Sequence, residues 1–258
     1  MYPILLEVGG FRLHSYGVVV LVATLVALWL AGREARRRGL GSEIVSDLAV
    51  PVVLAGFVGA RLAYVLGWEP DLLWRDPVGV LAVWRGGLAL HGGLLGGFAA
   101  GLWFCRRRRV SPWRMGDTVA PALILAQGIG RLACLLSGDS YGTPSDLPWA
   151  ITFTNPEAIA PLGVPLHPTQ LYEFGLDLGL FGLLWALRKR MAVDGRLFLL
   201  YAVGYGVIRV LTETVRGDRV ELAMGLSLLQ GASLALILAA AIALGWRMAT
   251  RREDARRV

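Results

Sequence analysis

Charge is scarce in this chain of 258 residues. Charged residues make up 17% of the sequence, whereas 55% of the residues are hydrophobic and the mean hydropathy is +0.57. A soluble globular domain carries about 25% charged residues. The composition therefore excludes an ordinary soluble protein and indicates an integral membrane protein with several spans.

Lysine is almost absent, because Lys189 is the only one among 26 basic residues and the others are arginines. A net charge of +7 would suit a nucleic-acid-binding protein. The arginines, however, stand in short clusters between apolar stretches. We therefore expect membrane lipids as the surroundings and no nucleic acid as a partner.

Cysteine is also rare, and Cys105 and Cys134 lack the spacing of a metal or redox motif. They fall at opposite ends of different apolar stretches, across a hydrocarbon layer of about 30 Å. A disulfide needs Cα atoms within about 7 Å, so we expect none. The first residues lack the features of a cleavable signal peptide.

Long apolar runs dominate what is present. Each span needs about 17–25 mostly apolar residues. Seven segments qualify: 14–32, 46–67, 88–104, 117–136, 170–187, 197–212 and 228–246. The sequence thus predicts an all-α membrane protein of about seven transmembrane helices. Without a repeat or a linker, residues 1–258 are expected to form a single domain.

The arginines also predict the orientation. Four segments, 33–38, 106–114, 188–196 and 247–257, hold 18 of the 26 basic residues, whereas the segments on the other side hold five. Basic loops stay in the cytoplasm, which places the N-terminus outside and the C-terminus in the cytoplasm. The long loop 137–169 is then outside. Segment 71–84 is too short to span and is expected to lie along the outer interface.

Three arginines fall within predicted spans, each toward the outer end: Arg61, Arg131 and Arg209. A guanidinium at membrane depth is costly unless an anion meets it, so such a residue is a functional candidate. For Arg61, pairing with a backbone carbonyl or with Glu173 or Asp177 is an equal alternative. Glu213 follows Arg209 by four residues and would share its helix face.

Other polar residues begin spans on the same side. His91 starts the third span, either as a plain interfacial residue or as a group that exchanges protons near neutral pH. Glycines at 93, 97 and 101 follow it and predict a close helix contact. Thr169 is expected to cap the fifth span. Arg216 is either a loop charge or part of the site.

These residues together suggest an outward-facing pocket with two or three guanidiniums and one imidazole. A guanidinium matches a phosphate group through paired hydrogen bonds. A phosphate at the depth of lipid headgroups most simply belongs to a phospholipid.

The chain resembles the prolipoprotein diacylglyceryl transferase family over nearly its whole length. The matching motifs are His14-Ser-Tyr16-Gly, Gly59-Ala-Arg61-Leu-Ala-Tyr, Leu90-His91-Gly-Gly-Leu, the stretch 128–142, His167-Pro-Thr-Gln-Leu-Tyr-Glu173 and Gly204-Tyr-Gly-Val-Ile-Arg209-Val-Leu-Thr-Glu213. Each motif is modest alone, and their order along the chain makes the set specific.

The resemblance implies a seven-helix protein of the bacterial cell (inner) membrane with its site on the outer, periplasmic or extracellular side. Its partners would be phosphatidylglycerol and prolipoprotein signal peptides with a lipobox cysteine. The diacylglyceryl group would pass to the cysteine thiol, forming a thioether and releasing glycerol phosphate.

The resemblance also implies roles for individual residues. Arg131 and Arg209 would neutralise the departing phosphate, and His91 would be the base for the thiol. The residues expected to bind phosphatidylglycerol are Arg131, Arg209, Tyr16, Asp139, Gly142, Glu213 and Arg61.

The chain departs from the family signature, Gly-Arg-x-Gly-Asn-Phe-x-Asn-x-Glu-x-x-Gly. Gly130, Arg131 and Gly142 are kept, while Ala133, Cys134, Ser137 and Asp139 replace a glycine, two asparagines and a glutamate. Cys134 lacks the donors and the acceptor of an amide. A related transferase with another acceptor is therefore an alternative. A lipid or anion transporter is another, although internal repeats and midplane polar residues are missing.

Overall fold

The structure is a computed structural model that describes residues 1–82, 86–191, 193–219, 221–223 and 226–254. In this part the chain forms eight α-helices and one short 3-10 helix: α1 Ser15–Arg37, α2 Glu43–Trp68, α3 Leu72–Arg75, η1 Gly79–Leu81, α4 Leu90–Arg107, α5 Pro112–Ser137, α6 Thr169–Leu187, α7 Arg196–Glu213 and α8 Leu228–Asp254. Three antiparallel strand pairs accompany them: β1 Ile4–Val8 with β2 Phe11–His14, β3 Ile151–Thr152 with β4 Pro165–Leu166, and β5 Glu221–Ala223 with β6 Leu226–Ser227.

Each of the seven predicted spans falls on a long helix. α1, α2, α5 and residues 229–246 of α8 are long and apolar enough to cross a membrane. These four helices and the mainly helical fold confirm the class of a multi-pass membrane protein. Membrane crossing by α4, α6 and α7 stays a prediction.

The chain divides into two compact units. One comprises residues 1–30 and 116–258, and the other comprises residues 31–115. The assignment of the whole chain to one membrane domain stays a prediction.

In the 31–115 unit, α2 and α4 are in backbone contact. A Cβ atom added at Gly59 would lie 2.4 Å from the carbonyl oxygen of Gly92, and one at Gly92 would lie 2.2 Å from the oxygen of Gly59. Only glycine permits so close an approach. The predicted helix contact is thus confirmed, although its tightest points are Gly92 and Gly96 rather than the expected glycines at 93, 97 and 101.

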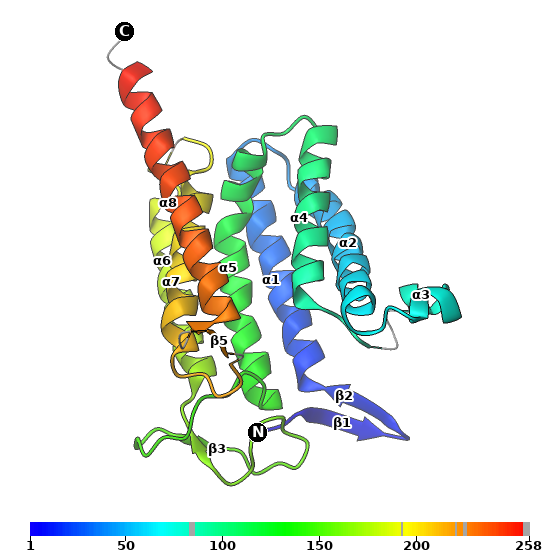
Figure 1. Cartoon of the computed structure of the whole chain (residues 1–258). Coiled ribbons are helices and arrows are strands. Elements are labelled where there is room, and N and C mark those ends of the chain that lie inside the picture. Colours follow the sequence, from blue (N-terminus) through cyan, green and yellow to red (C-terminus); the bar gives the residue numbers. More distant parts are fainter. Residues whose placement is uncertain (83–85, 192, 220, 224–225, 255–258) are drawn as a thin grey trace. The chain divides into compact units, whose positions relative to one another are not determined.

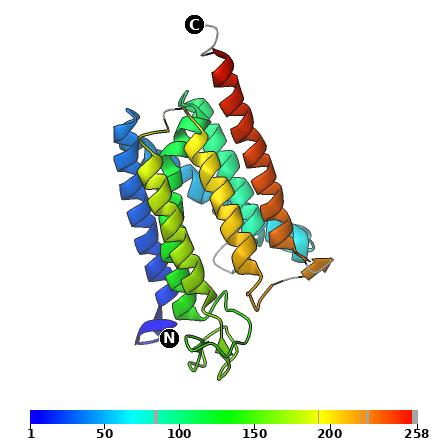
Figure 2. The same cartoon turned by 90° about the vertical axis from the view of Figure 1, so that its left-hand side faces the viewer.

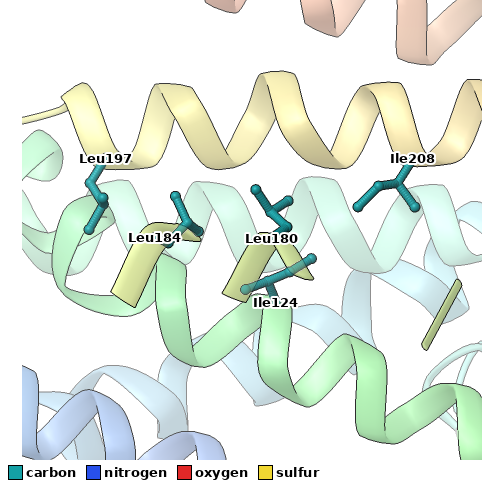
Figure 3. Close-up of a cluster of buried hydrophobic side chains, with 5 residues drawn as sticks. All are labelled: Ile124, Leu180, Leu184, Leu197 and Ile208. Carbon is teal, nitrogen blue, oxygen red and sulfur yellow. The ribbon is translucent and has the colours of Figure 1, made fainter. Parts of the chain in front are cut away.

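In the larger unit, α6 packs along α7 and α7 along α8 (Figures 1 and 2). Five buried side chains form the core between α5, α6 and α7 (Figure 3): Ile124, Leu180, Leu184, Leu197 and Ile208. The opposite faces of these helices stay apolar and exposed, as at Leu183 and Val207. That distribution suits helices surrounded by lipid.

A buried carboxylate ties α5 to the start of α7. Asp117 accepts hydrogen bonds from the backbone N–H groups of Gly195 and Phe198, both at 2.8 Å. It satisfies donors that the first turn of a helix leaves unpaired. The helices α5 and α7 are therefore held together at this end by hydrogen bonds as well as by apolar packing.

The predicted loop between the fourth and fifth spans joins α5 to α6 and has its own small core of Phe153, Ala160 and Leu166. The N-terminal hairpin β1–β2 was not predicted. Gly9 and Gly10 at its turn have φ of +57° and +84°. A Gly-Gly pair between two short apolar runs is a hairpin signal that the sequence does contain.

The segment 71–84, expected along the outer interface, contains α3 and η1. Residues 83–84 lie outside the described residues. Arg75 pairs with Asp71 at 3.5 Å on an exposed surface. The interfacial position of this segment stays a prediction.

The core packing predicts a contrast between two neighbouring leucines. Leu184 is fully buried and Leu183 is 48% exposed. Leu184→Ala should lower the free energy of unfolding by about 2–5 kcal/mol, because it leaves a cavity. Leu183→Ala should change it by only about 0.5 kcal/mol. Thermal unfolding in detergent measures both, and equal effects would contradict the assigned core.

Candidate active site

Glu173 is the centre of a buried network where α5 ends, α6 begins and α7 ends. Its carboxylate is 2% exposed. One oxygen pairs with Nε of Arg131. The other accepts hydrogen bonds from Nη1 of Arg209 at 2.7 Å and from the hydroxyl of Thr212 at 2.8 Å. One carboxylate thus brings together the two intramembrane arginines that the sequence singled out in this unit.

Glu213 is the second carboxylate. It accepts a hydrogen bond from Nη2 of Arg209 at 2.9 Å, as the spacing of four residues predicted. Its other oxygen accepts from the hydroxyl of Ser227 at 2.8 Å. Arg209 is therefore fixed from two sides, between Glu173 and Glu213.

Arg216 is the third guanidinium of the network. It donates two hydrogen bonds to Asp218, at 2.8 and 2.6 Å. It also lies 4.0 Å from Glu173 and 3.9 Å from Glu213. Burial opposes its charge, but the hydrogen bonds to Asp218 and the three carboxylates outweigh that effect and raise the pKa of Arg216. It therefore remains a permanent cation at the site, rather than an isolated loop charge.

The charges of this network balance. Arg131, Arg209 and Arg216 face Glu173, Glu213 and Asp218. Burying paired charges costs desolvation energy, so such a network is weak evidence for stability and stronger evidence for function. Arg131 contacts Glu173 through Nε, and no hydrogen bond from its two terminal nitrogens is found among the described residues, so these nitrogens can serve an anionic ligand.

The start of α6 also positions the loop that follows α5. The hydroxyl of Thr169 donates a hydrogen bond to the carbonyl oxygen of Ser140 at 2.6 Å. The side-chain amide of Gln170 donates one to the carbonyl oxygen of Asp139 at 2.7 Å. The prediction that Thr169 caps the helix was wrong. Pro168 occupies the cap position, and the Thr169 hydroxyl is used to hold the loop.

Gly142 lies at a crowded crossing of two segments. A Cβ atom there would lie 2.4 Å from the carbonyl oxygen of His167. This close approach lets Gly142 form a bridge with Arg216, while the N–H of Gly217 donates to the oxygen of Tyr141 at 3.0 Å. Gly142 therefore helps to set the position of Arg216.

Tyr16 and Asp139 line one cavity of about 460 Å³, whose other polar walls are His14, Ser137 and Glu157. Tyr16 also lies within electrostatic range of Asp139 and of Arg131. The cavity is large enough for a small polar headgroup.

The substituted signature positions make local contacts. The hydroxyl of Ser137 donates to the carbonyl oxygens of Ala133 and Cys134, at 3.0 and 3.2 Å. Cys134 is a buried free thiol, as is Cys105, so the expected absence of a disulfide is confirmed for both. The serine that replaces the signature asparagine at position 137 thus engages its hydroxyl with its own helix.

Arg61 is satisfied within the 31–115 unit. Its guanidinium, 3% exposed, donates to the carbonyl oxygens of Gly86 at 2.8 Å, Gly79 at 3.1 Å and Val80 at 3.2 Å. Of the pairings that the sequence left open for Arg61, the structure shows the backbone carbonyl oxygens, and contact of Arg61 with lipid stays a prediction.

His91 lies in the same unit, in the first turn of α4, and its side chain is exposed. Just before it, the N–H of Ala89 donates to the oxygen of Ala60 at 2.9 Å, which anchors the start of α4 to α2.

Three charged members of the network were missed from the sequence. Glu173 was named only within a motif and as a possible partner of Arg61, Arg216 was left open, and Asp218 was not considered. The motif His167-Pro-Thr-Gln-Leu-Tyr-Glu173 held the signal, because its carboxylate sits in the first turn of a span at the depth of Arg131 and Arg209.

Comparison with known proteins identifies the family that this chain matches. The family described as prolipoprotein diacylglyceryl transferase matches residues 3–246. Proteins named phosphatidylglycerol–prolipoprotein diacylglyceryl transferase are similar over most of the chain. That of Bordetella avium is 36% identical, covering 83% of this chain and 81% of its own. That of Vibrio cholerae is 38% identical, covering 86% and 81%. That of Synechococcus elongatus is 36% identical, covering 97% and 89%.

The contacts of Arg61 predict a stability defect. Arg61→Ala should lower the free energy of unfolding by roughly 2–4 kcal/mol, because buried carbonyl oxygens lose charged donors. Arg61→Lys should restore little of it, since an ammonium cannot reach carbonyls on several sides. Arg75→Ala, on an exposed pair, is the control. Thermal unfolding that ranks Arg61→Ala with this control would contradict the structural role.

Proposed function

This chain belongs to the prolipoprotein diacylglyceryl transferase family, and we propose that its Arg131 and Arg209 bind and neutralise the phosphate of phosphatidylglycerol. The protein is a phosphatidylglycerol–prolipoprotein diacylglyceryl transferase. It moves the diacylglyceryl group of the lipid to the lipobox cysteine of a prolipoprotein, which is the first step of lipoprotein maturation.

The reaction explains why arginines are needed. The acceptor sulfur attacks the glycerol carbon, a C–S bond forms, and the C–O bond to phosphate breaks with its electron pair on the phosphate oxygen. Charge on the phosphate grows as the bond breaks. Cations already fixed in a site of low dielectric stabilise that charge without reorganising.

One observation carries this proposal. Arg131 and Arg209, from two helices, converge on the single buried carboxylate of Glu173. A lipid phosphate resembles a carboxylate in charge and in its capacity to accept paired hydrogen bonds. The geometry that serves Glu173 therefore also suits a phosphate that engages the remaining N–H groups of Arg131.

The remaining lipid contacts follow the family resemblance. We assign Tyr16 and Asp139 to the headgroup, because both line the same cavity. Glu213 holds Arg209, and Gly142 permits the backbone crossing beside Arg216. Arg61 we assign to the fold of its own unit rather than to the lipid, because carbonyl oxygens already accept its donors.

His91 is proposed as the base that takes the proton of the acceptor thiol. A thiol with a pKa of about 8.5 is only a few per cent ionised at neutral pH. A neutral imidazole accepts such a proton readily. No metal or cofactor is needed, because the substrate supplies the nucleophile.

We further propose that α4, α6 and α7 complete a set of seven spans in the bacterial cell (inner) membrane. The N-terminus and the loop 137–169 would be outside, and the four arginine-rich segments would face the cytoplasm. The site would then open toward exported prolipoproteins, whose lipobox cysteine reaches the membrane from that side.

A transferase with the same lipid but another acceptor is the nearest alternative, since Cys134 and Ser137 stand where the family signature has asparagine. Purified protein, phosphatidylglycerol and a lipobox peptide distinguish the two. Thioether product together with glycerol phosphate supports the proposed acceptor. Lipid binding without either product favours the alternative.

The phosphate role predicts the effect of removing either arginine. Arg131→Ala and Arg209→Ala should each lower kcat/KM on the order of 100- to 1,000-fold, because the developing charge loses a fixed cation. Each Arg→Lys variant should be intermediate, since lysine keeps the charge but not the paired donors. Release of glycerol phosphate measures the rate.

Arg108→Gln is the matched control, because it removes an exposed arginine that pairs with Asp47. Its rate should stay close to that of the unchanged protein. A near-normal rate for Arg131→Ala or Arg209→Ala in folded protein would refute the phosphate assignment.

The role of His91 predicts a dependence on pH. His91→Asn should lower kcat at neutral pH on the order of 100-fold, because the thiol loses its proton acceptor. Activity should recover partly as the pH rises toward the thiol pKa of about 8.5, since the thiolate then forms unaided. Full activity at neutral pH would exclude His91 as the base and leave the arginine roles intact.

A further inference from the structure

Asp177 is a buried carboxylate that the proposed reaction does not yet use. It follows Glu173 by four residues on α6 and is 1% exposed. Within the described part of the chain, neither of its oxygens has a hydrogen-bond partner. A buried polar group without a partner is rare and requires an explanation.

The surroundings of Asp177 hold it against the arginine network. A Cβ atom added at Gly128 would lie 3.2 Å from the Cβ of Asp177, so the backbone of α5 packs closely against this side chain. Gly128 precedes Arg131 by three residues. The ionisable groups within electrostatic range come from all three core helices: Arg131, Glu173, Arg209, Tyr201 and Tyr205.

The charge balance leaves no cation for Asp177. Three guanidiniums already face three carboxylates without it. An ionised Asp177 would make the network net negative before an anionic lipid arrives. Two carboxylates four residues apart on one helix face are neighbours, and buried neighbours of like charge favour sharing one proton.

We propose that Glu173 and Asp177 share one proton and deliver it to the phosphate oxygen that departs from the lipid. The proposal rests on the phosphate role of Arg131 and Arg209. When the phosphate engages these arginines, Glu173 and the phosphate share the same cations. A proton between the two anions then relieves their repulsion, and Asp177 is the group that supplies it.

The step balances. The acceptor sulfur forms the C–S bond, and the C–O bond breaks with its electron pair on the phosphate oxygen. The thiol proton passes to the base, for which His91 is the proposed group. The proton held by Glu173 and Asp177 passes to the departing oxygen. The base then releases its proton to water and the carboxylates regain one from water, so the net transfer is from thiol to glycerol phosphate.

Asp177→Asn is the sharpest test, because asparagine has the shape of the neutral acid but no proton to give. No donor group of the described residues bonds to Asp177, and the asparagine amide can donate to Glu173 where the shared proton was, so the protein should fold with an unchanged thermal midpoint. We expect kcat to fall on the order of 100-fold, the effect of a lost general acid. The KM for phosphatidylglycerol should change little.

Two readouts separate proton delivery from a structural role. The kcat of the unchanged enzyme should fall at high pH as the carboxylate pair loses its proton, and this fall should vanish in Asp177→Asn. The infrared carbonyl band of a protonated carboxylic acid should be present in the unchanged protein and absent in the variant. Asp177→Glu should restore most of kcat.

Asp47→Asn is the matched control, because it neutralises a carboxylate that pairs with Arg108. Its pH profile and infrared band should match those of the unchanged protein.

Normal kcat and an unaltered pH profile in Asp177→Asn would overturn the shared proton while leaving the arginine roles untouched. A raised KM like that of Arg131→Ala would also overturn it, by making Asp177 part of lipid binding. Loss of the arginine effects themselves would instead refute the phosphate role.

Discussion

The ion pairs of Glu173 with Arg131 and Arg209 are the interaction on which the candidate site depends. One carboxylate on α6 holds one arginine from α5 and one from α7. The desolvation cost of burying charged side chains at membrane depth is offset only when charges of opposite sign are in contact. The three helices must therefore meet at this level, and the apolar core around Ile124 and Leu180 fixes their spacing. The site is thus a product of helix packing and of electrostatics together.

Because the charges of the network balance, the arrival of an anionic phosphate changes its net charge. An arriving phosphate competes with Glu173 for guanidinium donors, and the protein must then accommodate one more negative charge. Arg216, held by Asp218, adds a cation that never titrates. Asp177 adds a carboxylate without a partner. Catalysis of phosphate departure needs both a fixed positive field and a place for a proton, and this end of the helix bundle contains candidates for each.

The sequence predicted the long helices and part of the candidate site, and the contacts that it did not predict were missed for physical reasons. Apolar runs located all seven long helices, because a membrane demands continuous hydrophobicity that is easy to read. Arg131, Arg209 and Glu213 were found because charge is conspicuous in such runs. The contacts of Thr169 and Gln170 with the loop were not, since they join residues about 30 positions apart. Arg61 was undecided for the same reason: its carbonyl acceptors come from a loop without a sequence signature.

The glycine contact between α2 and α4 has a consequence for the two polar residues beside it. Gly59 precedes Arg61 by two positions, and Gly92 follows His91 directly. Because the two backbones touch at these glycines, one helix cannot slide or rotate without moving the other. The side chains of Arg61 on α2 and His91 on α4 are in this way held at a fixed position along the helices relative to one another. Any side chain, even a methyl group, would release that lock and shift both groups at once.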